Sequence, residues 1–223
     1  MGTKIKITKR QMKEDKFTTF MLRARDEFLG RWQVIAISAA IVIVAIVATV
    51  YFLNLQQSRQ LEADNRLTKA LAELRRANYQ VAILELGSIA DDYGGRAAGT
   101  ALFNLANAHY ESKNYDEAIT NYQKFIDNYD LGKLMTVSAI GGIAACLENK
   151  QEFLAAGDKY HEAVQFDPDS PLAPDFYLGA IRSLVAAGDK DKAEQLLSEL
   201  KDKFPDSEQA RTATRLAMQL QTQ

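Results

Sequence analysis

After residue 58, an alanine-centred pattern recurs four times, and this repeat constrains the fold more than any other feature. The aligned alanines are separated by 36, 38 and 37 residues. A fixed period of this size indicates an architecture in which each unit is one supersecondary element and neighbouring units stack to bury a shared core. The four anchors are Ala82, Ala118, Ala156 and Ala193. The sequence therefore predicts a stacked array of similar units.

The residues around each anchor predict helices. The chain holds only four prolines, and its long stretches of Ala, Leu, Glu, Lys and Gln are typical of helical proteins. Twelve residues after each anchor stands a turn former or helix stopper. These are Gly94, Asp130, Pro168 and Pro205. Small alanines allow helices to approach closely, and larger neighbours fill the space around them, so we expect all four units to be helix pairs.

The second copy, from Ala101 to Tyr122, resembles the tetratricopeptide repeat family most clearly, at Leu105, Ala106 and Ala118. The unit of that family is a pair of antiparallel helices of about 34 residues. The resemblance implies an all-α fold, with a tetratricopeptide-like solenoid of about four helix pairs in the repeat domain. The last segment, 207–221, is predicted to be a capping helix.

Residues 34–53 form a run of twenty positions without a charged side chain, ending at Leu53. A helix of this length matches the hydrocarbon core of a bilayer, about 30 Å thick. Trp32 and Tyr51 lie near its two ends, where amphipathic rings favour the headgroup layer. A buried core helix would ordinarily be shorter, and a cleaved signal peptide would have a shorter charged region before it. We therefore predict a single transmembrane helix.

Residues 1–33 hold nine basic and four acidic residues, which predicts a cytoplasmic N-terminus. Between Lys16 and Arg31, apolar residues recur at helical spacing among the basic ones, so this stretch is either an interfacial amphipathic helix or a solvated basic segment. The apolar positions are Phe17, Phe20, Met21, Ala24 and Phe28. The predicted domains are a basic tail (1–33), a span (34–53) and a repeat domain (54–223). We expect a single-pass protein of the bacterial inner membrane with a periplasmic repeat domain.

Charge and motif content argue against several functions. The formal net charge is -2, and residues 54–223 hold eighteen basic against twenty-five acidic residues, which argues against nucleic-acid binding. Nucleophile elbows, phosphate loops and paired-histidine motifs do not occur in the sequence. His109 and His161 are too few for a typical zinc site, and Cys146 lies in an apolar run typical of a buried core position. We expect no enzymatic activity, cofactor, metal or small-molecule substrate.

The resemblance also implies a binding groove lined by the first helix of each repeat. Arg182 is the only cation among the matching positions, so a basic clamp for a C-terminal carboxylate is not evident. The mostly apolar set predicts binding of apolar or amphipathic polypeptide. Gly141 and Gly142 indicate either tight packing or a ligand surface. The matching positions are Phe103, Asn107, Tyr110, Ser138, Gly141, Ala145, Glu148, Leu178, Arg182 and Val185.

The order of basic tail, single span and four repeats is similar to that of the ancillary subunit family of the bacterial Sec translocon, whose repeats are related to those of a cell-division coordinator. This resemblance implies a chaperone-like accessory of protein translocation, with translocon components or exported clients as partners. The alternative is a scaffold for cell-envelope assembly or division that binds one fixed envelope protein by its groove or its convex face. The repeat motif specifies architecture better than partner.

Overall fold

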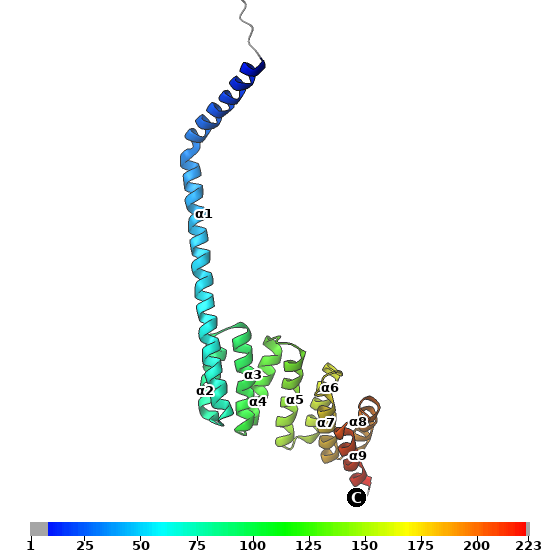
Figure 1. The fold of residues 1–223 in the computed structure, drawn as a ribbon. Helices are drawn as coiled ribbons and strands as arrows, with labels where there is room; N and C mark the ends of the chain where they lie inside the picture. Colours follow the sequence, from blue (N-terminus) through cyan, green and yellow to red (C-terminus); the bar gives the residue numbers. More distant parts are fainter. Residues whose placement is uncertain (1–8, 222–223) are drawn as a thin grey trace, which may run out of the picture. The chain divides into compact units, whose positions relative to one another are not determined.

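The computed structural model describes the main chain of residues 9–221 and the side chains of residues 16–27 and 29–217. Every regular element in this range is a helix, as predicted (Figure 1). Residues 1–8 of the predicted tail and the side chain of Phe28 lie outside the described residues. The helices are α1 (Lys9–Arg75), α2 (Tyr79–Asp92), α3 (Gly95–Glu111), α4 (Tyr115–Asn128), α5 (Lys133–Asn149), α6 (Phe153–Phe166), α7 (Ala173–Ala187), α8 (Lys190–Lys203) and α9 (Glu208–Gln221).

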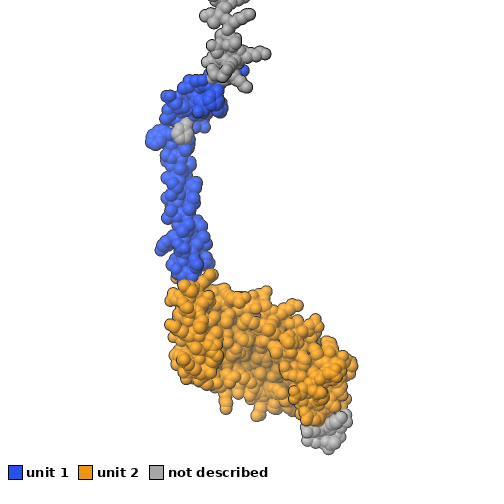
Figure 2. All heavy atoms as spheres, viewed as in Figure 1, with its two compact units in different colours: residues 1–58 blue, residues 59–223 orange. Residues whose placement is uncertain are grey.

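The chain divides into two compact units, Met1–Ser58 and Arg59–Gln223 (Figure 2). Among the described residues, one helical segment, Leu29–Arg75, is long and apolar enough to span a membrane, with a mean hydropathy of 2.8 in its most apolar window. The hydroxyls of Ser38 and Thr49 donate to backbone carbonyls four residues earlier, at 2.8 Å in both cases. These two polar groups are therefore satisfied within the helix, as a lipid environment requires.

The second unit is a solenoid of four helix pairs and a last helix. The final turns of α1 pack on α2, and the pairs α3–α4, α5–α6 and α7–α8 follow, each helix packing on the next. The last helix, α9, packs on α7 and α8. The Oγ of Ser207 caps it by accepting from the N–H of Ala210 at 3.1 Å. The predicted solenoid with a C-terminal capping helix is confirmed.

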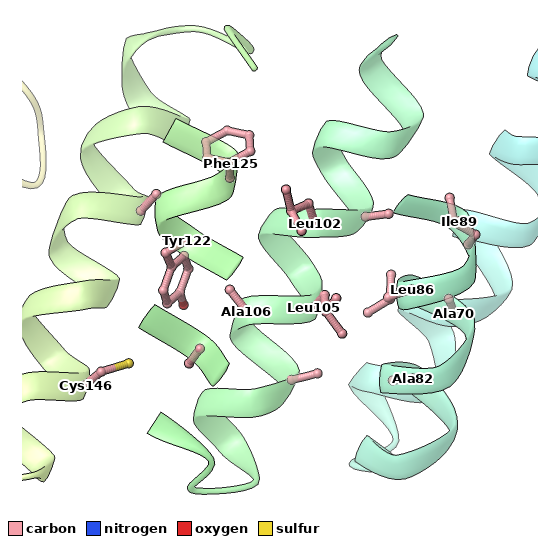
Figure 3. Packing of buried hydrophobic residues seen from close by; sticks show 14 of the residues in the cluster. Ala70, Ala82, Leu86, Ile89, Leu102, Leu105, Ala106, Tyr122, Phe125 and Cys146 are labelled. Carbon is pink, nitrogen blue, oxygen red and sulfur yellow. The ribbon is translucent and has the colours of Figure 1, made fainter. Parts of the chain in front are cut away.

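The repeat anchors lie in the core. Ala82, Ala118, Ala156 and Ala193 are all completely buried. Larger side chains fill the space between the helices they bring together, and Leu86 of α2 and Leu105 of α3 point toward one another in Figure 3. Burial of a leucine side chain contributes about 1.5–3 kcal/mol, so stability is distributed along the stack.

The turn inside each helix pair has the same backbone geometry. Five residues before each anchor, φ is positive: 60° at Ala77, 64° at Lys113, 65° at Gln151 and 82° at Gly188. This left-handed conformation ends the first helix of the pair and reverses the chain. Only the fourth copy places there the residue that adopts it without a steric penalty, which is glycine.

Candidate functional site

A groove of about 530 Å³ lies against α3, α4, α5, α6 and α7, and we call it the central groove. Its volume falls within the range of about 300–1,000 Å³ that is typical of ligand sites. The first helices of three successive repeats supply most of its surface. The lining residues are Asn107, Tyr110, Glu111, Tyr122, Ser138, Gly141, Gly142, Ala145, Tyr160, Leu172, Asp175, Phe176, Leu178, Gly179 and Arg182.

Seven of the ten positions named from the sequence lie together on the central groove. They are Asn107, Tyr110, Ser138, Gly141, Ala145, Leu178 and Arg182. The other three lie beside it or in the core. Phe103 packs edge-on against Tyr122 and Phe125, with ring centroids 5.8 and 5.4 Å apart. Glu148 binds Arg182, and Val185 packs on a core cluster with residues from α5, α6, α7, α8 and α9.

Aromatic rings packed on glycines form the walls of the central groove. A Cβ atom added to Gly142 would lie 2.5 Å from the Cζ of Tyr122, and one added to Gly179 would lie 3.0 Å from the ring of Tyr160. The ring of Phe176 is packed even more closely on Gly141. Each glycine is inside a helix and gives a neighbouring ring room to approach the backbone. Tight packing, one of the two alternatives that the sequence left for Gly141 and Gly142, is therefore observed, and both glycines also line the central groove.

Polar groups on the central groove are tied to one another. The hydroxyl of Tyr122 donates to Oδ1 of Asn107 at 2.5 Å, and Nδ2 of Asn149 donates to the hydroxyl oxygen of Tyr110 at 3.2 Å. Burial raises the pKa of both tyrosines, so both keep their protons at neutral pH. The side chain of Tyr110 is half-buried, and its hydroxyl accepts the hydrogen bond from Asn149 at the edge of the groove.

The cation on the central groove is neutralised inside the repeat array. Arg182 of α7 donates from Nε and Nη2 to the two carboxylate oxygens of Glu148 on α5, at 2.5 and 2.7 Å. The hydroxyl of Tyr160 donates to the same carboxylate at 3.2 Å. The bond to Glu148 raises the pKa of Arg182. This bidentate geometry satisfies the carboxylate from two sides and orients the guanidinium toward Glu148.

Two family models match the repeat helices. A tetratricopeptide repeat model matches residues 67–132, and a second tetratricopeptide repeat model matches residues 150–216. Together the matches cover more than half of the chain. This chain belongs to the tetratricopeptide repeat family. Such repeats form protein–protein interaction modules, and the fold is generally a non-catalytic scaffold for binding proteins or peptides.

Solved structures resemble the fold of this tetratricopeptide repeat protein. Two crystal structures of nearly identical TPR-like repeats from Podosopora anserina, from a protein described as a kinesin light chain, each align with a TM-score of 0.58 and 12% identity. Each alignment covers 72% of this chain and 87% of the other. YrrB, a TPR protein with an unusual peptide-binding site, aligns with a TM-score of 0.32 and 16% identity over 67% of this chain and 90% of its own. No curated protein sequence matches this chain.

The cysteine and the two histidines, the side chains best suited to act as nucleophile, general base or metal ligand, do not line the central groove. Cys146 is completely buried, and burial raises the pKa of its thiol to about 12, so the thiolate is scarce at neutral pH. The half-buried His109 has a pKa lowered by desolvation, and His161 lines a separate pocket of about 210 Å³. Among the described residues, no three His, Cys, Asp or Glu side chains are grouped to hold a metal ion.

The sequence did not predict the second-helix contribution to the central groove. Tyr122 and Tyr160 fill space between the helices, and each also lines the groove. Phe176, Glu111 and Asp175 line the groove from the first helices without having been named. The glycines inside the helices were a sequence signal for the aromatic rings of the groove wall, because a helical glycine in a core indicates that a neighbouring group approaches the backbone closely.

Proposed function

We propose that this tetratricopeptide repeat protein is an inner-membrane-anchored interaction module whose central groove holds apolar or amphipathic polypeptide segments, as a chaperone-like accessory of protein translocation. The observation that carries the proposal is the composition of the groove. Half-buried apolar and aromatic side chains from different helices converge on it, among them Tyr110 of α3, Ala145 of α5 and Phe176 of α7. Apolar side chains of a client gain free energy when they leave water for such a surface, at about 25 cal/mol per Å².

The apolar helix and the basic tail support the membrane part of the proposal. Isolated spans in lipid are helical, and the uncharged run 34–53 has the length that a bilayer core requires. The basic excess before it favours a cytoplasmic N-terminus, so the repeat unit would lie in the periplasm, where exported segments emerge. Fusions to alkaline phosphatase test this orientation. The enzyme is expected to be active when fused after residue 58, and a fusion before residue 33, which lacks the span, is the inactive control. An inactive fusion after residue 58 would refute the topology.

Affinity purification from non-ionic detergent, followed by mass spectrometry, tests the client-binding role. The groove variant Ser138→Trp places a large ring in the central groove, and Ser198→Trp on the exposed face of α8 is its matched control. We expect the native chain and the control to retain translocon components and many substoichiometric exported proteins, and the groove variant to lose the exported proteins. One stoichiometric envelope protein in all three samples would instead indicate the alternative function, a scaffold for envelope assembly or division.

A further inference from the structure

The charges around the central groove are unequal in sign. Glu111 and Asp175 line the groove, and Arg182 is the one cation that lines it among the described residues. Because Glu148 binds Arg182 through both carboxylate oxygens, that cation is already matched. The two lining carboxylates therefore give the groove an excess of negative charge.

Neighbouring contacts do not cancel this excess. Asp175 accepts a hydrogen bond from the neutral amide Nε2 of Gln209 at 2.7 Å, which leaves its charge in place. Glu111 is an exposed side chain at the C-terminal end of α3. Lys150, at the end of α5, is held by Asp116 and Glu152 at 2.6 and 2.9 Å, and so is matched by acids of its own.

We propose that the central groove selects polypeptide segments in which apolar side chains alternate with lysine or arginine, and disfavours acidic segments and free C-terminal carboxylates. This inference rests on the proposed function, because it names the chemistry of the segment that the groove would hold. Apolar side chains of the segment contact the aromatic walls, and its cations lie near Glu111 and Asp175. A carboxylate would find Arg182 occupied by Glu148 and would meet two uncompensated acids.

The acidity of the whole repeat unit acts in the same direction. Residues 54–223 carry seven more acidic than basic residues. Charge of one sign over a surface raises the local concentration of oppositely charged ligands, and it adds to the selectivity that close contacts create. A cationic apolar segment is thus attracted at long range and matched at short range.

Fluorescence anisotropy with three labelled twelve-residue peptides tests the inference. All three have the same Leu and Phe positions, and the intervening positions are Lys, Gln or Glu. The full chain is held in nanodiscs of zwitterionic lipid, and empty nanodiscs give the blank. We expect the Lys peptide to bind about tenfold more tightly than the Glu peptide at low salt, with the Gln peptide between them. The difference should shrink in 0.5 M salt, because ions screen the attraction.

Two variants test whether the preference for the Lys peptide comes from the carboxylates that line the central groove. The double variant Glu111→Gln with Asp175→Asn should lose most of the preference for the Lys peptide over the Glu peptide, and it should keep the smaller part that comes from the acidity of the whole repeat unit. The control variant Glu194→Gln removes an exposed acid of α8 outside the groove and should keep the tenfold preference. Equal binding of all three peptides to the native chain, or tighter binding of the Glu peptide, would overturn the charge selection while leaving groove binding intact. Binding of none of the peptides would instead overturn the proposed function.

Discussion

Replacement of Gly142 by alanine tests whether a buried ring defines the wall of the central groove. The added Cβ would lie 2.5 Å from Cζ and 2.7 Å from Cε2 of Tyr122. The ring of Tyr122 is almost completely buried, is packed against Phe103 and is hydrogen-bonded to Asn107, so it cannot move aside without loss. The substitution must therefore shift either the ring or the helix α5.

The net change in the free energy of unfolding is the sum of one stabilising and two destabilising contributions. Alanine is favoured over glycine in a helix by about 1 kcal/mol. Overpacking a core costs about 1–3 kcal/mol, and the lost hydrogen bond to Asn107 costs about 1 kcal/mol. We expect Gly142→Ala to lower the free energy of unfolding by about 2 kcal/mol. For a domain of this size that corresponds to a fall of roughly 4–8 °C in Tm.

Gly87 provides the matched control because it is also inside a helix, α2, and a Cβ added there meets no atom within 4 Å. Gly87→Ala should therefore raise stability by about 0.5–1 kcal/mol. Circular dichroism at 222 nm during heating of the full chain in non-ionic detergent measures both changes. A melting temperature of Gly142→Ala equal to that of Gly87→Ala, or above it, would refute the close approach of the Tyr122 ring to Gly142.

Four further substitutions give three separate tests. A residue other than glycine in the left-handed conformation costs about 1–2 kcal/mol, so Lys113→Gly should raise the free energy of unfolding in urea by about 0.5–1 kcal/mol. Gly188→Ala should lower it by about 1–2 kcal/mol. A destabilising Lys113→Gly together with a stabilising Gly188→Ala would contradict the shared turn geometry. Glu148→Gln should free Arg182 and raise the affinity for the Glu peptide about threefold in the anisotropy assay, and an unchanged affinity would show that the pair does not control the groove. Burial raises the pKa of the Cys146 thiol from 9, its ordinary value, to about 12, so the folded state holds the thiol proton more tightly than the unfolded state. The resulting contribution to the free energy of unfolding is complete below pH 9 and is lost toward pH 12. Cys146→Ala should therefore show a shallower decline of stability between pH 9 and pH 12, and a decline identical to that of the native chain would count against the burial effect.

The repeat architecture could be predicted because its determinants are local. The alanine anchors recur at nearly constant spacing, and residues such as Pro168 and Pro205 end helices wherever they occur. The four buried alanines and the buried Cys146 follow from that pattern. The turns were less predictable, because Ala77, Lys113 and Gln151 adopt a conformation that their residue types do not favour. There the geometry of the helix pair determines the backbone against local preference.

The central groove could be predicted only in part. Positions on the first helices follow from the repeat register, which placed Tyr110, Ala145 and Leu178 on one surface. The glycine contacts of Tyr160 and Phe176 depend on how closely two helices approach, a distance that sequence spacing does not give. The pairing of Glu148 with Arg182 joins residues 34 positions apart, which is the family repeat length, so it is the kind of contact that a repeat alignment can reveal.

Site-specific photo-crosslinking in bacterial cells tests the central claim most directly. A photoreactive phenylalanine analogue is placed at Ser138 or Leu178, on the central groove, and at the exposed Leu154 of α6, which is outside it. We expect the two groove positions to capture translocon components and exported polypeptides, and position 154 to capture neither. Capture of these partners from position 154 alone, or from none of the three positions, would contradict the claim that this repeat protein holds polypeptide segments in its groove.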